Sequence, residues 1–399
     1  MSLDPIGVRA QFPAITDDVA QLDGPGGTQT AEPVAVAVAD ALRAAVSNRH
    51  GPFAASERAE RIVVDARQAA ADLLNVAPSG VVLGPNMTTV TLGLARALRR
   101  TWSPGDEVVL SRLDHDANIR PWVIAARDAG ATVRWAEVDV ATGDLPVGQY
   151  ADLVTARTRL VAVTSASNAI GTMPDVRAIA DIAHAAGALV HVDGVHATPH
   201  HSVDVAALGA DFYACSSYKF YGPHLGMTAA DPALWAELTP DKLLPSPDSV
   251  PDRFETGTMQ FELLAGLTAC VDYIASLAPE GGTRRDRLVA AMTDVTAYES
   301  ALFAELLAGL RVMDGIELVA APARRSPTVA FNVAGWAPAD VAKALGAQGI
   351  CVWAGHYYAF ELMAALGLGE GGAVRVGIAH YNTRAEIERL LAALRRLTG

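Results

Sequence analysis

Cysteine is scarce in this sequence, and its few occurrences follow no pattern. The three cysteines, Cys215, Cys270 and Cys351, have neither the paired spacing of a disulfide framework nor the spacing of zinc ligands. We therefore expect no structural disulfides and no metal site.

Long apolar runs and an excess of basic residues are also missing. No run reaches the length of a membrane span, and the start, MSLDPIGVRAQFPAI, lacks the basic and apolar regions of a signal peptide. We expect a cytoplasmic protein with no membrane partner. The 31 lysines and arginines are outnumbered by 44 aspartates and glutamates, and the net charge of −13 argues against nucleic acid as a partner.

The composition that remains is that of a large globular protein. Apolar residues make up 51% of the chain and charged residues 19%, which excludes an intrinsically disordered chain. At 399 residues the chain exceeds the size at which a single hydrophobic core stops growing. We therefore expect two domains.

Helical and strand patterns alternate through the first two thirds of the chain. Apolar residues recur at helical spacing in SERAERIVVDARQAAADLLN and in DVRAIADIAHAAG, where Gly187 ends the helix. Short apolar runs predict strands in GVVLGP, DEVVLS, TVRWAEVDV, RLVAVT, ALVHVD and DFYACS. This alternation predicts an α/β fold with a mostly parallel sheet that is covered on both faces.

The pattern changes after about residue 280. A long helical stretch leads to the strand-like segments TVAFNV and ICVWAG, and Thr383 with Glu386 forms a capping box before a last helix. We predict a large domain over residues 21–295 and a smaller α+β domain over residues 1–20 and 296–399, although a helix crosses the boundary near residue 295.

Polar side chains follow the predicted strands, where an open α/β sheet binds its ligands. Asp193 ends one strand and Lys219 follows the next. The two could form a buried ion pair. They also fit a pyridoxal phosphate (PLP) site, where Lys219 forms the imine and Asp193 keeps the pyridine nitrogen protonated.

Other candidates each have a structural and a functional interpretation. The segment GPNMTTVT places backbone N–H groups, among them that of Met87, and the hydroxyls of Thr88 and Thr89 at a helix start. This arrangement is either an ordinary cap or a phosphate site. Ser216 and Tyr218 could donate to the same phosphate. His115 is a structural histidine or a ring that stacks on pyridine.

Two more residues fit a substrate carboxylate. Asn168 could equally be a turn residue, and Arg375 could equally be a surface arginine. A substrate carboxylate, however, is bound best by a bidentate guanidinium, which Arg375 could supply.

Seven segments together resemble, in order, the class V aminotransferase family and specifically its cysteine desulfurase-like branch. They are QLDGPGGTQ, GDEVVLSRLDHDANIRPW, SNAIGT, VHVDGVHATPH, DFYACSSYKFYGPHLG, RFETGT and VRVGIAHYN. The resemblance implies a fold type I PLP-dependent transferase, with a large domain built on a seven-stranded sheet, a smaller C-terminal domain, and a homodimer with shared active sites.

The resemblance also implies a role for each candidate residue. Lys219 is the Schiff-base lysine, Asp193 pairs with the pyridine nitrogen and His115 stacks on the ring. His196 occupies the place of a glutamine that many relatives hold against the ring hydroxyl. The phosphate is bound by Met87, Thr88, Ser216, Tyr218 and, from the other subunit, Thr258, while Asn168 and Arg375 bind the substrate carboxylate.

One position departs from the desulfurase pattern. Desulfurases carry a nucleophilic cysteine on a loop after a Gly-His pair, and here the matching residue is Tyr358. Cys351 lies upstream in an apolar run, where a buried structural thiol is expected, and Trp353 replaces an arginine often found at that place.

The sequence therefore predicts a PLP-dependent enzyme, a lyase or a transferase, that acts on an amino acid or an amino-acid-containing compound. We expect β-elimination at a C–S bond without a protein persulfide, with His356, Tyr357 and Tyr358 at the substrate. GHYYAF could instead form an aromatic wall around a larger substrate. An aminotransferase or epimerase of the same family, and a non-catalytic scaffold of the same fold, remain the alternatives, and the substrate itself stays open.

Overall fold

A seven-stranded sheet forms the centre of the computed structural model, which describes residues 3–399. Four neighbouring strand pairs are parallel, and β8 runs antiparallel to both of its neighbours. The strand order is β2 (Val81–Gly84), β8 (Gly226–Ala230), β7 (Phe212–Ser216), β6 (Leu189–Asp193), β5 (Thr158–Thr164), β3 (Glu107–Ser111) and β4 (Thr132–Ala136). The predicted α/β class with a mostly parallel seven-stranded sheet is confirmed.

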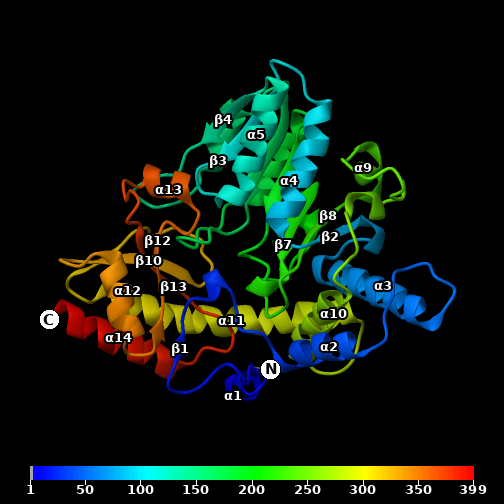
Figure 1. The fold of residues 1–399 in the computed structure, drawn as a ribbon. Helices are drawn as coiled ribbons and strands as arrows, with labels where there is room; N and C mark the ends of the chain where they lie inside the picture. Colours follow the sequence, from blue (N-terminus) through cyan, green and yellow to red (C-terminus); the bar gives the residue numbers. More distant parts are fainter. Residues whose placement is uncertain (1–2) are drawn as a thin grey trace.

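Alternate residues of the strands pack on opposite faces of this sheet. Val108 and Leu110 of β3 lie in one core with the helices α4 (Met87–Leu98), α5 (Arg120–Ala129) and α9 (Pro232–Glu237). Val109, between them, lies in the other core with α2 (Glu32–Arg43), α3 (Ala54–Leu74), α7 (Val176–Ala185) and α10 (Phe261–Ser276). Both faces are therefore covered by helices (Figure 1).

A second, four-stranded sheet is entirely antiparallel. Its order is β12 (Trp353–Gly355), β13 (Ala373–Gly377), β10 (Thr328–Val333) and β9 (Ile316–Leu318). It packs with α12 (Pro338–Gly346) and α14 (Arg384–Thr398) around a core of its own. The predicted capping box of α14 is confirmed, since the Glu386 carboxylate accepts the backbone N–H of Thr383 at 2.7 Å.

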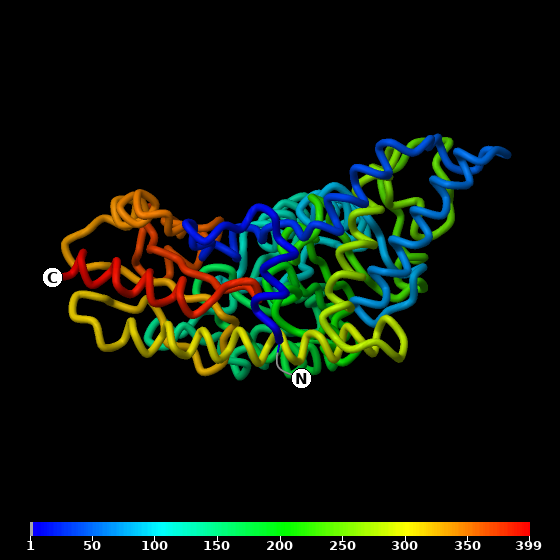
Figure 2. The backbone as a smooth tube through the Cα atoms, turned by 90° about the horizontal axis from the view of Figure 1, so that it is seen from below, coloured from blue at the N-terminus to red at the C-terminus, as the bar shows by residue number. Residues whose placement is uncertain are grey.

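The helix α11 (Arg284–Arg311) joins the two parts of the molecule. Met292 and Val295 belong to the core of the large sheet, whereas Leu302 and Leu306 belong to the core of the small one. Figures 1 and 2 show this helix running from α10 and α3 to α14. The division at residue 295 stays a prediction, and the helix passes through it without a break.

The N-terminal segment contacts both cores. Phe12 lies in the core of the large sheet, and β1 (Ala20–Gln21) pairs in parallel with β11 (Ile350–Cys351) of the smaller part. The remaining helices are short: α1 (Pro5–Arg9), α6 (Tyr150–Leu153), α8 (Val205–Leu208) and α13 (Phe360–Ala365). Within residues 3–399, no helix has the length and apolar character required to cross a membrane.

Candidate active site

A cavity of about 710 Å³ opens at the carboxyl ends of the parallel strands. Thr164 ends β5, Asp193 ends β6 and Ser216 ends β7. Because parallel strands end at one edge of a sheet, their last side chains meet there. The cavity wall includes twelve of the predicted site residues: Met87, Thr88, His115, Asn168, Asp193, His196, Ser216, Tyr218, Lys219, Tyr357, Tyr358 and Arg375.

Two predicted residues are not part of this wall. Thr258 lines a second cavity near Thr256 and Glu255. The side chain of His356 faces its own loop, where its Nδ1 accepts the backbone N–H of Tyr358 at 3.2 Å.

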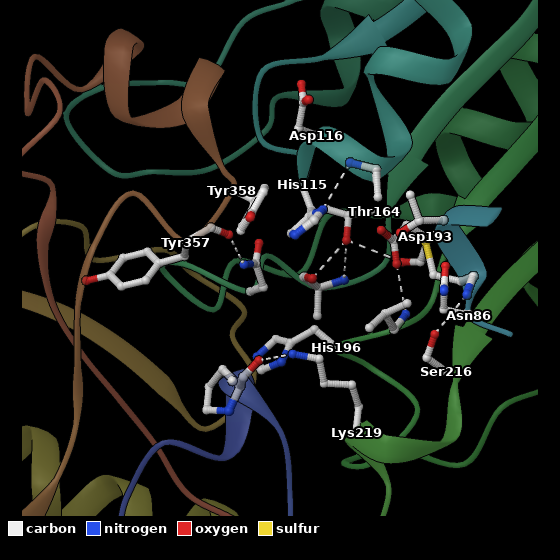
Figure 3. Close-up of a pocket in the computed structure, with 18 of the residues that line it drawn as sticks. Asn86, His115, Asp116, Thr164, Asp193, His196, Ser216, Lys219, Tyr357 and Tyr358 are labelled. Atoms are coloured by element: carbon white, nitrogen blue, oxygen red, sulfur yellow. Dashed lines mark hydrogen bonds between the residues drawn. The ribbon is translucent and has the colours of Figure 1, made fainter. Parts of the chain in front are cut away.

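Lys219 projects into the cavity from the turn that follows β7 (Figure 3). Its Nζ donates to the backbone carbonyl of Pro25. Burial, and secondarily the charge of Arg375, lower the pKa of the amine from 10.5 to about 7. A large fraction of this amine is therefore an uncharged nucleophile near neutral pH.

Asp193 is almost fully buried on the opposite wall of the cavity. Its Oδ1 accepts the backbone N–H of Val195 at 2.9 Å. Burial raises the pKa of this carboxyl group to about 6. A cation placed beside a buried carboxylate stabilises its charged form, so the geometry fits a protonated ring nitrogen.

His115 holds a defined tautomer. Its Nδ1 accepts the N–H of Ala117 at 3.0 Å, so the proton of the neutral ring is on Nε2. Burial lowers its pKa to about 4, which keeps the ring neutral. The ring stacks on Tyr358 with 5.5 Å between the centroids.

The residue before this ring, Asp114, is completely buried. It accepts hydrogen bonds from Ser111 Oγ at 2.5 Å and from Asn118 Nδ2 at 2.7 Å. Burial raises its pKa to about 8. These contacts fix the backbone from which His115 projects.

The N-terminus of α4 forms the opposite end of the cavity. Asn86 caps this helix, and Ser216 Oγ accepts the backbone N–H of Met87 at 3.0 Å. A Cβ atom on Gly226 would lie 2.2 Å from Met87 N, so glycine allows β8 to approach the helix start closely. A helix N-terminus beside hydroxyl groups is suited to a phosphate.

Arg375 is buried and partly neutralised. Its Nη2 donates to Asp23 Oδ1 at 2.7 Å and its Nη1 to the Asn168 carbonyl at 3.0 Å. The guanidinium also lies 4.4 Å from the centroid of the Tyr357 ring. Arg375 Nε and Asn168 Oδ1 are buried without a hydrogen-bond partner. Both side chains line the cavity, so a ligand that supplies an acceptor and a donor fits beside them.

His196 lies in the wall between the two sheets. Its Nε2 is 3.0 Å from Thr328 Oγ1 and 3.1 Å from Ser326 Oγ. Burial keeps its pKa well below 6.5, so the ring is neutral.

Sequence reasoning missed two acidic residues that hold this site. Asp23 binds Arg375, and Glu299 binds His200 behind His196 at 2.7 Å. No spacing connects residues 23 and 375. The only available signal for Asp23 was its place in the segment QLDGPGGTQ.

These residues fit PLP. The buried carboxylate of Asp193 suits the ring nitrogen, the start of α4 suits the phosphate and the amine of Lys219 suits the aldehyde. Arg375 and Asn168 lie in the same wall, and the guanidinium suits a carboxylate.

Comparisons with known proteins show the family to which the chain belongs. The family model described as "Aminotransferase class-V" matches residues 20–390. An uncharacterized protein of Mycobacterium tuberculosis is 37% identical over the full length of both chains. A cysteine desulfurase of Klebsiella pneumoniae is 32% identical over 98% of this chain and 97% of its own.

Solved structures place the fold in the same group. A cysteine desulfurase of Thermococcus onnurineus superimposes with a TM-score of 0.90 at 26% identity, over 100% of this chain and 98% of that one. The chain therefore belongs to the class V aminotransferase family, in its cysteine desulfurase-like branch, and is a PLP-dependent enzyme.

Proposed function

We propose that the chain catalyses β-elimination from an amino acid that carries a sulfur-linked group on its β-carbon, without a protein persulfide. The observation that carries this proposal is the side chain next to His115, which is Tyr358 and not a thiol. Cys215 and Cys270 are buried in the core of the large sheet, and Cys351 lines a different cavity. No cysteine is part of the wall around Lys219.

Lys219 is the proposed base. Its lowered pKa leaves a free amine near neutral pH, and its side chain projects into the cavity that Asp193 also lines (Figure 3). When bound, PLP supplies an electron sink for the pair left behind when the α-proton is removed. The carboxylate of Asp193 would keep the ring nitrogen of the bound cofactor protonated, and the neutral ring of His115 would lie beside it without adding charge.

Arg375 and Asn168 are the proposed carboxylate site. The guanidinium of Arg375 lines the cavity and is the proposed donor to the substrate carboxylate, and Asp23 keeps it in place. Asn168 Oδ1 accepts a hydrogen bond from the substrate side.

Tyr358 is the proposed proton donor for the leaving thiolate. Of the two tyrosines in this loop, Tyr357 is buried and donates its hydroxyl to the carbonyl of Ala373. Tyr358 is exposed to the cavity. Lys219 takes up the α-proton and Tyr358 gives one proton to the thiolate, so the number of protons on the enzyme is unchanged. Hydrolysis of the remaining fragment consumes one water, and the products are the thiol, pyruvate and ammonia.

Product analysis tests the proposal. Incubation with L-cysteine and with S-methyl-L-cysteine is expected to yield pyruvate, ammonia and, respectively, sulfide and methanethiol. Alanine together with a persulfide on Cys351 would instead establish desulfuration with a relocated cysteine. A product mixture of a 2-oxo acid and an aminated acceptor, or a racemised amino acid, would favour the aminotransferase or the epimerase of the same family.

A protein that binds PLP but changes no amino acid would be a scaffold. We also propose a homodimer with Thr258 at the partner's phosphate site, and a cytoplasmic location stays a prediction.

A further inference from the structure

An exposed apolar wall bounds the outer part of the cavity. Tyr358 is 68% exposed, Trp353 57% and Ile124 36%, and all three line the same cavity as Lys219. We propose that this wall binds a bulky apolar, preferably aromatic, group on the substrate side chain. The inference rests on the proposed function, because it takes the substrate carboxylate to lie at Arg375.

The position of Trp353 links the wall to the carboxylate site. Trp353 of β12 is the direct cross-strand partner of Arg375 in β13. Opposite residues of an antiparallel pair project from the same face of the sheet and contact each other. An amino acid held by Arg375 therefore has the indole as its neighbour.

Tyr358 is held in an unfavourable backbone conformation. Tyr357 and Tyr358 have φ angles of 53° and 58°, in the left-handed region that tyrosine rarely adopts. Asn168 Nδ2 donates to the Tyr357 carbonyl at 2.9 Å, and the N–H of Asp116 donates to the Tyr358 carbonyl at 2.8 Å. Contacts with the large domain thus hold the exposed ring above the cavity, beside His115 (Figure 3). Backbone strain of this kind is found where a side chain is positioned for function.

The arginine at the cavity wall next to these rings is paired within the protein. Arg120 lies 3.0 Å from Asp116, which lines the same cavity, and 3.9 Å from Glu361. The charge of Arg120 is therefore already partnered by carboxylates. An apolar group gains from the wall because its binding removes the exposed rings from water.

The cavity must hold the cofactor as well as the substrate. Its volume of about 710 Å³ lies within the ~300–1,000 Å³ of pockets that hold drug-sized ligands, a range that suits the cofactor and an amino acid with its side chain together. A substrate as small as cysteine would leave the rings of Trp353 and Tyr358 in water.

The test uses stable conjugates and not turnover. N-(phosphopyridoxyl)-S-benzyl-L-cysteine and its S-methyl counterpart are titrated by calorimetry into the full-length chain freed of cofactor. We expect the benzyl conjugate to bind about tenfold more tightly or better, equivalent to ~1.4 kcal/mol. Trp353→Ala should abolish most of this preference and Trp353→Phe should retain most of it.

Trp336 provides the matched control. It is another partly exposed tryptophan, but its Nε1 donates to the Leu397 carbonyl and it does not line the cavity. Trp336→Ala should leave the preference unchanged.

Three results would overturn the inference. The first is that the benzyl conjugate binds no more tightly than the methyl conjugate, and the second is that neither conjugate binds. The third is that the Trp353→Ala protein keeps the preference but sediments as a smaller species. That result would assign the wall to a subunit contact. Failure of the proposed elimination can be distinguished from failure of this inference. If the benzyl conjugate binds tightly but S-benzyl-L-cysteine yields no pyruvate, the proposed reaction is wrong and the proposed binding site stands.

Discussion

Lys219, the proposed imine-forming residue, is a buried side chain whose amine loses its proton easily. An ammonium group is costly to desolvate, and the nearby guanidinium of Arg375 adds repulsion, so the folded chain favours the neutral amine. The charges of Asp23 and Asp193 raise the pKa of Lys219, but they raise it by less than burial lowers it. The residue is therefore reactive in a pH range where an exposed lysine is almost fully protonated.

The first prediction is the pH dependence of cofactor capture. Only the neutral amine attacks an aldehyde, and the pKa of Lys219 is lowered from 10.5 to about 7. The rate at which the cofactor-free chain captures PLP should therefore rise as the pH increases from 6 to 8 and level off above it. Stopped-flow absorbance measures the rate, and borohydride followed by peptide mapping identifies the lysine.

A rate that keeps rising to pH 10 would contradict this prediction. The other lysines, Lys242 and Lys343, serve as internal controls in the peptide map, because they lie outside the cavity and should remain unlabelled.

At the scale of elements, the proposed phosphate site depends on the distance between the strand β8 and the start of the helix α4. The strand β8 passes directly behind the start of α4, and a Cβ on Gly226 would lie 2.0 Å from the backbone carbon of Asn86. Backbone atoms cannot give way as flexible side chains can.

We predict that Gly226→Ala weakens the affinity for PLP at least tenfold by displacing the helix start. Gly93→Ala, in the same helix, is the control, because its Cβ would meet no atom within 4 Å. A helix-interior alanine should instead stabilise the chain by ~0.5–1 kcal/mol. Fluorescence titration with PLP and urea unfolding measure the two effects. An unchanged affinity in Gly226→Ala would exclude the close approach as a requirement.

The elements that carry the site were predictable because of their local patterns. β6 and β7 are short buried runs, and Asp193 and Ser216 stand at their ends, where parallel strands meet. The capping box of Thr383 and Glu386 is likewise a signal of four adjacent residues.

Contacts between distant segments could not be predicted in the same way. Asp23 and Arg375 are 352 residues apart, and His200 and Glu299 are 99 apart. Their meeting depends on how β1, β13 and α11 pack, which no local pattern encodes. The direction of Tyr357 was hidden for another reason, since a left-handed tyrosine contradicts the usual backbone preference.

At the scale of the whole molecule, the segment that carries Thr258 is anchored by hydrogen bonds, but Thr258 does not line the cavity around Lys219. Glu255 accepts hydrogen bonds from Arg67 at 2.9 and 3.0 Å and from the N–H of Leu83 at 2.8 Å. Thr258, three residues on, is exposed beside a second cavity. This arrangement is suited to a side chain that completes the site of another copy of the chain.

The last prediction follows from that arrangement. In a homodimer with shared sites, Lys219→Ala removes a residue from its own site, and Thr258→Val removes one from the partner's site. Thr258→Val alone should weaken PLP binding about tenfold or more, since a hydrogen bond to a charged group contributes ~1.5–3 kcal/mol.

A mixed dimer of the two variants contains one site with both changes and one site with neither. The two variants are mixed under conditions in which subunits exchange. The mixture should then contain tightly bound cofactor that borohydride fixes to the chain, which neither variant shows alone. Sedimentation as a monomer, or a mixture that behaves as the sum of its parts, would show that each chain builds its site alone.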